Sequence, residues 1–498
     1  MLEPISTRQW NEPCAAHLMN RAGFGVTPAE ITALARRKPV DVVTELVDYE
    51  KTYESDSSPT WVNADSDKRP DRRAVREMSD EDREAFLRER RQREMSDLLE
   101  LRAWWLYRMR FSKRPLQEKL TLFWHGHFAT SIEKVREAYV LYAQNETFRR
   151  LANGNWRELV LAVAKDPAML IYLDNAQSRA EAPNENFARE LMELFTLGEG
   201  NYTERDIKEA ARAFTGWSIE DDRFVYKLRL RAHDNGPKSF MKKRGPLYGE
   251  DIIDAILDHK EAAPFICRKL WRFFAYDEPE PEIVNGLADV LRKNKFEFKP
   301  VLQTMFLSRA FYSTKAARTQ IKSPVQWLVG LCRSLDAPLP GPDVSSLILR
   351  ALGQELFAPP NVKGWDGGYT WITTATLMQR YNFAGVLVKG GEAFQEVDQS
   401  GRRFGGPGGM LMRRGLDKLA RLPSLVDPAK ILPESAREST ATAKAHLQML
   451  LYQVRLPPEQ SAALDEALAK MPEPKAWSDN EVRDVIHVMM STPYFQLT

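Results

Sequence analysis

The loop and helix at residues 172–198 carry the first side chains whose types and spacing could do chemistry. Asn186, Glu190 and Glu193 follow one another at i, i+4 and i+7, so they share one face of a regular helix. Two carboxylates one turn apart can hold a cation or share a proton. Surface helices often carry the same spacing, and Arg189 with Glu193 would then form an ordinary ion pair. Spacing alone leaves both interpretations open.

Two histidines one residue apart form a second candidate group. His125 and His127 are among only 7 histidines in the chain, and they stand beside aromatic residues. On an extended backbone their imidazoles would point the same way and could ligate a metal, whereas on a regular helix they would diverge. Gly126 between them predicts that a helix ends there, so the relative direction of the two rings stays undecided.

A His-Asp pair follows the most strand-like segment of the chain. Residues 224–230 alternate apolar and charged side chains, which predicts a strand. His233 and Asp234 come directly after it and precede Gly-Pro, in a loop position where binding groups often lie. We therefore expect His233 and Asp234 to be acid-base candidates and Lys238, a few residues on, to be a binding candidate.

Tryptophans near glycines are candidates for a saccharide site. Trp365 and Trp371 lie in the aromatic, Gly-rich segment 358–371, and Trp217 follows a glycine that ends a predicted helix. Indole rings on such loops can stack on flat or sugar-like ligands, and packing against a neighbouring helix explains them equally well.

The elements that must position these residues are mostly helices. Apolar residues recur at the helical period through most of the chain, which predicts a mainly α fold with a small strand or hairpin element near 217–232. Five regions are expected: N-terminal helices at 1–51, a charged excursion or linker at 52–95, a main helical domain at 96–395, a flexible Gly- and Arg-containing insertion at 396–436, and C-terminal helices at 437–498 that pack back on the main domain.

Composition excludes several classes of protein. The net charge is +2 from 71 basic and 69 acidic residues, so no global field points to nucleic acid or an anionic membrane. The 3 cysteines lie far apart and do not form a disulfide framework, which favours a reducing compartment. No signal peptide is visible, and no apolar run is long enough to span a bilayer. These features predict a soluble, cytoplasmic protein.

Short motifs spread from about 14 to 497 together resemble one family. They are His17–Gly25, Leu122–Ser131, Asn184–Gly198, Ala213–Trp217, His233–Lys238, Lys269–Phe274 and Pro360–Trp365. In these segments the chain is similar to the bacterial family catalogued as domain of unknown function 1800, which has no established activity.

The resemblance carries two implications. Relatives often bear export signals and tend to be encoded beside a sulfatase-like family, which implies a periplasmic or cell-surface location and a sulfatase-like partner. This chain departs from its relatives because it lacks a visible signal. It also has Phe195 where many relatives have a histidine.

Two functions of different classes are expected. The first is a hydrolase with a polar cleft that acts on a saccharide or cell-surface substrate, in which histidine and carboxylates hold a divalent metal such as zinc, manganese or iron, or two carboxylates act without metal. The candidate residues are His125, His127 and Glu190 as metal ligands, Glu190, Glu193, His233 and Asp234 as catalytic groups, and Asn184, Asn186, Lys238, Trp217, Trp365 and Trp371 as substrate-binding groups. The alternative is a non-catalytic scaffold in which the motifs form ion-pair networks with Arg189, Arg212 or Lys238, and the 52–95 excursion or the 401–409 tip engages a partner.

Overall fold

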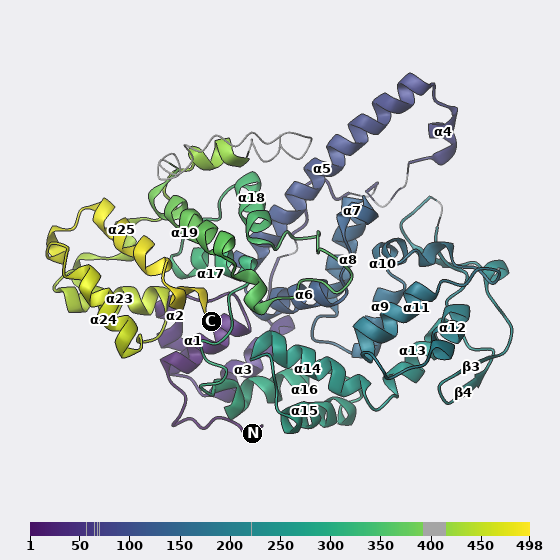
Figure 1. Cartoon of the computed structure of the whole chain (residues 1–498), viewed down its shortest axis with the longest axis horizontal. Coiled ribbons are helices and arrows are strands. Elements are labelled where there is room, and N and C mark those ends of the chain that lie inside the picture. The colour runs from purple at the N-terminus through teal and green to yellow at the C-terminus, as the bar shows by residue number, and fades with distance from the viewer. Residues whose placement is uncertain (56, 64, 67, 69, 221, 392–414) are drawn as a thin grey trace.

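Figure 1 shows a computed structural model of the chain, which describes residues 1–55, 57–63, 65–66, 68, 70–220, 222–391 and 415–498. The chain is mainly helical, as the periodicity predicts. Across these described residues, the strands form only two short antiparallel pairs. The predicted tip at 401–409, and the first part of the predicted 396–436 insertion up to residue 414, lie outside the described residues.

The N-terminal region folds into three short helices with well-defined starts. They are α1 (Glu12–Arg21), α2 (Pro28–Ala35) and α3 (Pro39–Val47). The Thr27 side chain accepts from the Glu30 amide, and the Glu30 carboxylate accepts from the Thr27 amide, which is the capping box that the sequence predicts. Each of the three helices has a proline in its first turn, where the missing N–H costs nothing.

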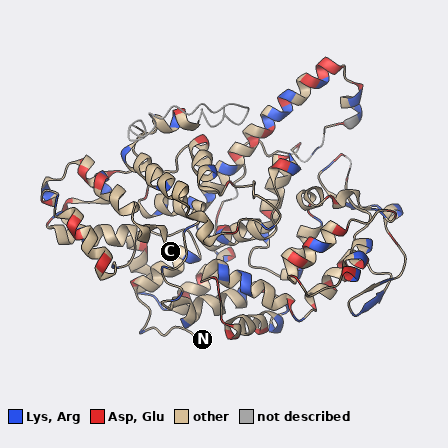
Figure 2. Ribbon diagram, viewed as in Figure 1, with Lys and Arg blue, Asp and Glu red and all other residues tan. Residues whose placement is uncertain are grey.

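A long helix projects from the body of the molecule. Helix α4 (Arg72–Glu77) precedes α5 (Asp80–Phe111), and the N-terminal half of α5 stands away from the other helices with α4 beside its tip (Figure 1). Basic and acidic residues follow one another along this projecting half (Figure 2). The C-terminal half enters the core, where Leu101, Trp105 and Met109 are fully buried at the helical spacing that the sequence shows.

The middle of the chain supplies the helices that surround the candidate residues. They are α6 (Pro115–His127), α7 (Ile132–Val135), α8 (Ala138–Arg150), α9 (Trp156–Ala164), α10 (Pro167–Tyr172), α11 (Glu185–Glu190), the π-helix η3 (Leu191–Thr196) and α12 (Glu204–Ala213). Two hairpins follow, in which β1 (Trp217–Ile219) pairs with β2 (Tyr226–Leu228) and β3 (Lys238–Phe240) pairs with β4 (Lys243–Gly245). The first hairpin lies in the predicted strand region, and the second is not predicted.

The remaining helices complete the body. They are α13 (Gly249–Leu257), α14 (Ala262–Phe274), α15 (Pro281–Lys293), α16 (Phe298–Leu307), α17 (Pro324–Ser334), α18 (Pro342–Leu352), α19 (Thr374–Lys389), α22 (Pro428–Ile431), α23 (Thr440–Leu451), α24 (Pro458–Leu468) and α25 (Asp479–Met490). The last of these, α25, lies against α19, and α23 lies against α17, so the C-terminal helices contact the middle of the chain (Figure 1).

Helix α6 lies between two apolar cores. One core joins the N-terminal helices to α9–α16, and it contains Leu120 and Trp124 of α6. The other core joins α5 and α8 to α17–α19 and the C-terminal helices, and it contains Leu122 of α6. Because α6 contributes to both cores, its remaining side chains lie along the seam between them. The candidate site is on that seam.

Candidate functional site

A cleft of about 410 Å³ opens beside α6. Four segments line it: one face of α6, the C-terminal half of α14 with Asp277, the segment 319–326, and the loop 354–371. The volume is within the range of about 300–1,000 Å³ that is common for small-molecule sites. The cleft therefore has the size of a ligand site, and its walls come from parts of the chain that are distant in sequence.

One face of α6 forms the first wall. Lys119, Leu122, Phe123, Gly126 and His127 all line the cleft, and their spacing of i, i+3, i+4, i+7 and i+8 is that of a single helical face. On the neighbouring helix α14, the lining residues Lys269, Arg272 and Phe273 follow the same rule. The two helices therefore present aromatic and basic side chains to the same space.

The aromatic loop lies directly on the end of α6. At Gly364, where φ is +82°, an added Cβ would approach the Gly126 carbonyl oxygen to 2.2 Å. Only glycine permits both this backbone conformation and this close approach. The contact places Trp365 beside α6, with an atom of its ring 3.9 Å from the position that a Gly126 Cβ would take. Trp365 and Trp371, two of the predicted substrate-binding residues, both line the cleft.

The π-helix η3 is fixed to the cleft wall through its carbonyl groups. A π-helix pairs each carbonyl with the amide five residues on, and the Leu197 amide accordingly donates to the Met192 carbonyl. Lys269 Nζ donates to the Leu194 carbonyl at 2.9 Å. His127 Nε2 donates to the Phe195 carbonyl at 3.0 Å. The two side chains that hold η3 are themselves cleft-lining residues.

Both nitrogens of His127 are occupied. Its Nδ1 lies 3.2 Å from Lys269 Nζ, and its Nε2 is bonded to the Phe195 carbonyl. Burial and the adjacent Lys269 ammonium lower the pKa of His127 well below its usual value, so the ring is neutral at pH 7. His127 therefore has a structural role, in which its ring binds the backbone of the π-helix.

His125 points away from the cleft into an aromatic environment. Its Nε2 accepts a hydrogen bond of 3.1 Å from the Phe357 amide, and its ring packs against Trp105 and Trp365. Burial lowers the pKa of His125 to about 3. His125 thereby anchors the start of the aromatic loop.

The predicted metal site therefore needs correction. In each of the two histidines, the nitrogen lone pair that a metal would need is already used in a hydrogen bond. His125 and His127 are also two positions apart on a helix, so their rings point in different directions. In the part of the chain that the structure describes, no three His, Cys, Asp or Glu side chains converge as metal ligands. His125, His127 and Glu190 are not brought together as a ligand set.

Lys119 is the most unusual polar group in the cleft. Its residue is 3% exposed, and its amine lies 4.9 Å from the ring centre of Phe24 and 5.6 Å from that of Phe273. Among the described residues the amine has neither a hydrogen bond nor an ion pair. Burial, with the nearby Arg21 guanidinium, lowers the pKa of Lys119 to about 7.

The cleft is basic. Lys119, Lys269, Arg272 and Lys363 line it, against two acidic residues, Asp277 and Asp366. The nearest such pair, Arg272 and Asp277, is separated by 4.0 Å between Nε and Oδ1, with both side chains more than half exposed, so the two charges neutralise each other weakly. The excess of positive charge favours an anionic ligand.

The predicted carboxylate pair, Glu190 and Glu193, lies outside the cleft, with Glu190 close enough to Lys363 of the cleft loop to be affected by its charge. Glu193 accepts a hydrogen bond of 2.9 Å from the Tyr202 hydroxyl. Partial burial, together with the charge of Glu193, raises the pKa of Glu190, and Lys363 of the loop acts in the opposite direction. Neither carboxylate is among the residues that line the cleft.

His233, Asp234 and Lys238 belong to a different place and fasten the second hairpin to α12. The Asp234 carboxylate pairs with Arg212 at 2.7 Å, and the Lys238 amine donates to the Gly236 carbonyl at 3.1 Å. His233 stacks on Tyr248 with ring centres 4.5 Å apart. These contacts lie outside the cleft.

The other predicted binding residues also lie outside the cleft. Asn184 caps α11 by accepting from the Asn186 amide at 3.0 Å, and its side-chain amide donates to the Leu173 carbonyl. Asn186 itself is exposed. Trp217 is fully buried and packs edge-on against Phe214, so it cannot contact a ligand.

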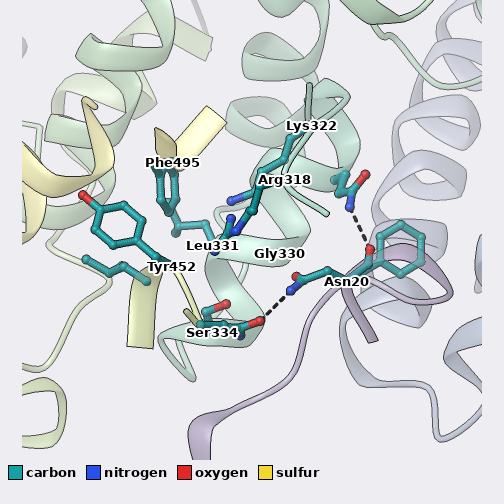
Figure 3. Close-up of a pocket in the computed structure, with 12 residues that line it drawn as sticks. Asn20, Arg318, Lys322, Gly330, Leu331, Ser334, Tyr452 and Phe495 are labelled. Carbon is teal, nitrogen blue, oxygen red and sulfur yellow. Dashed lines mark hydrogen bonds between the residues drawn. The ribbon is translucent and has the colours of Figure 1, made fainter. Parts of the chain in front are cut away.

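A much smaller cavity is lined by Phe24, Arg318 and Lys322 among other residues. Figure 3 shows Arg318 and Lys322 beside each other at this cavity, with Phe495 close by. Its volume is about 10 Å³, which is space for one water molecule. It cannot hold a saccharide or a nucleotide.

Sequence reasoning misses the basic residues of the cleft. Lys119, Lys269, Arg272 and Lys363 are not among the predicted site residues. The signal for Lys119 is present, because a lysine sits on the otherwise apolar face formed by positions 122, 123, 126 and 127. The other three are ordinary surface-type residues until the fold places them around one space.

Comparisons with known proteins give the family and nothing narrower. Over the described residues no helix combines the length and the apolar character that crossing a membrane requires. No curated protein and no solved structure matches the chain. The model of the family described as "Protein of unknown function (DUF1800)" matches residues 17–497, nearly the whole chain, and the chain therefore belongs to that family.

Proposed function

We propose that the protein binds an acidic saccharide in the cleft beside α6. The observation that carries the proposal is the meeting of loop tryptophans with an excess of basic side chains in one concave site. Aromatic rings supply flat apolar surfaces for sugar rings, and the basic groups supply partners for carboxylate or sulfate groups. A neutral saccharide would leave those basic groups without partners.

The aromatic and the basic side chains of the cleft have separate roles in this proposal. Trp371 is 7% exposed and sits deep in the loop, whereas Tyr369 is 87% exposed at its tip. The sugar ring would therefore lie along Trp365 and Trp371, while Lys363 and Arg272, both exposed, contact its acidic groups from the rim. Interactions at the rim are screened by salt, so the affinity should fall as ionic strength rises.

Titration of the protein with trigalacturonate, followed by calorimetry, tests this proposal. Trp365→Ala removes a stacking surface and should weaken binding at least tenfold, by the loss of about 1.5 kcal/mol or more. Tyr107→Ala is the matched control, since Tyr107 is an exposed aromatic residue on α5 away from the cleft. Equal affinity of the wild type and Trp365→Ala would contradict the proposal.

A second candidate function is hydrolysis of the bound saccharide. The observation that favours it is Glu190, whose pKa is raised by burial and by Glu193, as a general acid requires. Glu190 does not line the cleft, so it would act only on a ligand that extends past Lys363 of the cleft loop, which is close enough to influence its charge. Glu190→Gln keeps the shape of the side chain and removes its proton-transfer capacity. It should abolish release of reducing ends while the affinity for trigalacturonate stays unchanged, and an unchanged rate would exclude Glu190 from the reaction.

A further inference from the structure

The floor of the cleft holds a lysine with no counter-charge among the described residues. Lys119 is the only one of the four cleft cations whose residue is buried, at 3% exposure, and its amine still reaches the cleft. A charged ammonium is costly to bury unless something pairs with it. The aromatic rings of Phe24 and Phe273 stabilise a cation only in part.

No nearby carboxylate of the chain satisfies Lys119. Glu118, its neighbour on α6, is bound by Arg108 and Arg149. Asp277 and Asp366 line the cleft and form no ion pair with the amine. No carboxylate of the described residues therefore pairs with the Lys119 amine.

The other charged group near Lys119 is also cationic. Arg21 of α1 is 1% exposed, and its guanidinium donates to the backbone carbonyls of Ala275, Ala316 and Thr498. Arg21 therefore adds positive potential at the floor of the cleft.

A neutral donor also lines the cleft, on the loop that begins at residue 354. Gln354 is 5% exposed and lines the cleft, and its Oε1 accepts from the Val325 amide at 3.0 Å. Its Nε2 hydrogens have no acceptor among the described residues. The Nε2 atom is not enclosed by the chain, so it can donate to solvent or to a ligand in the cleft.

We infer that Lys119 is the buried partner of an oxyanion group of the ligand, a carboxylate, sulfate or phosphate, and that its amine takes up a proton when this group binds. An oxyanion would supply the counter-charge that Lys119 lacks and acceptors for the Gln354 amide. The oxyanion site is part of the proposed saccharide site. It rests on the proposed function only in that the oxyanion group is attached to a saccharide.

Proton uptake follows from the electrostatics of the floor. With the cleft open, burial and Arg21 hold the pKa of Lys119 at about 7, so a large share of the amines is neutral at pH 7.5. A bound anion raises that pKa, and the neutral share must then gain a proton. Affinity for the anion should be highest below pH 7 and should fall as the pH rises above 7.

Calorimetry with inorganic sulfate at pH 7.5, in two buffers of different ionisation enthalpy, measures the uptake directly. The wild type should take up a substantial fraction of one proton per sulfate. Lys119→Met should bind sulfate at least tenfold more weakly with no proton uptake, and Lys119→Arg should bind without uptake because its guanidinium is always charged.

Two controls test whether Lys119 or another group takes up the proton. Lys363→Met removes an exposed cleft lysine, so it should weaken sulfate binding but leave the number of protons taken up per bound sulfate unchanged. Lys269, whose pKa burial lowers to about 8, is the other group that could take up the proton. Persistent uptake in Lys119→Met would assign the proton to such a group and overturn the inference, and so would the absence of uptake in the wild type.

Folding of the variant is checked in the same series. Methionine fills the space between Phe24 and Phe273 without a charge, so Lys119→Met should have a Tm at or above that of the wild type without sulfate. Sulfate should raise the Tm of the wild type and not that of the variant. If sulfate behaves in this way while trigalacturonate fails to bind, the oxyanion site stands and the saccharide proposal falls.

Discussion

The amine of Lys269 lies 2.9 Å from the carbonyl oxygen of Leu194, and this contact joins α14 to the π-helix. A π-helix has poorer packing than an α-helix and is found mostly as a single turn at functional sites. Here its carbonyls are held by two cleft residues, Lys269 and His127. The wall of the cleft and the unusual helix therefore depend on each other.

Removal of the Lys269 amine should destabilise the protein. Lys269→Met leaves the Leu194 carbonyl and His127 Nδ1 without their partner, and a lost partner of this kind costs about 1–3 kcal/mol. Urea denaturation measures the change. Lys363→Met, which removes an exposed lysine of the same cleft, should change the free energy of unfolding by less than about 0.5 kcal/mol. Equal stabilities of the two variants would show that Lys269 does not support the π-helix.

The close approach of the aromatic loop to α6 predicts a strict requirement for glycine at position 364. Gly364→Ala introduces a Cβ that would meet the Gly126 carbonyl at 2.2 Å, so the loop must move away and Trp365 with it. Affinity for trigalacturonate should fall several-fold, and stability should fall too.

Gly200→Ala is the matched control for this variant. Its φ of +80° is nearly the same as that of Gly364, but no atom lies within 4 Å of an added Cβ. It should lose about 1 kcal/mol from backbone strain alone and keep its ligand affinity. Similar losses of affinity in both variants would mean that the contact with α6 does not position the loop.

How far the sequence predicts this fold is clear from the helix ends. The capping box of Thr27 and Glu30, and the serine caps at Ser79 and Ser478, are readable because capping needs only residues within one turn. The same holds for the buried spacing of the second half of α5. Local rules act within a few residues, so they leave a visible pattern.

The π-helix and the second hairpin cannot be predicted from local sequence patterns. Residues 186–195 carry a regular α-helical pattern, but the carbonyls at 194 and 195 are fixed by side chains that are about 70 residues away in sequence. The hairpin β3–β4 has strands of only 3 residues, and it is held by the Glu209 carboxylate, which accepts from the Ser239 amide at 2.7 Å. Long-range contacts of single side chains decide both elements.

The same limit explains the candidate site. The loop tryptophans stand out by type, and two of the three line the cleft. The histidines stand out equally, but their nitrogens bond to backbone groups of Phe357 and Phe195 that the sequence cannot place. Residue type therefore finds candidates, and only the fold shows which of them share a space.

Loss of the Glu118 carboxylate should have a large effect on stability and on acid resistance. It is fully buried and pairs with Arg108 and Arg149, each at 2.8 Å. Glu118→Gln removes the buried carboxylate charge that Arg108 and Arg149 share and leaves them only Glu54 and Glu146, which should cost about 3–5 kcal/mol. Glu466→Gln, at an exposed ion pair, should cost less than about 1 kcal/mol.

The pH dependence follows from the same contacts. Burial alone would raise the pKa of Glu118, but Arg149 and Arg108 outweigh it, so the pKa is lowered on folding. The stabilisation is therefore complete above the unfolded value of about 4.3, and it is lost as the pH falls through the lower folded value. Urea titrations between pH 3 and pH 7 should show a steeper loss for the wild type than for Glu118→Gln, and parallel curves would contradict this assignment.

The most direct test of the account compares two ligands that differ only in charge. Calorimetric titration with trigalacturonate and with its fully methyl-esterified form keeps the sugar rings and removes the three carboxylate charges. The basic, tryptophan-lined cleft predicts that the acid binds at least tenfold more tightly than the ester, and that this preference shrinks as salt is added. Equal binding of the two ligands, or binding of neither, would contradict the central claim that the cleft beside α6 is a site for acidic saccharides.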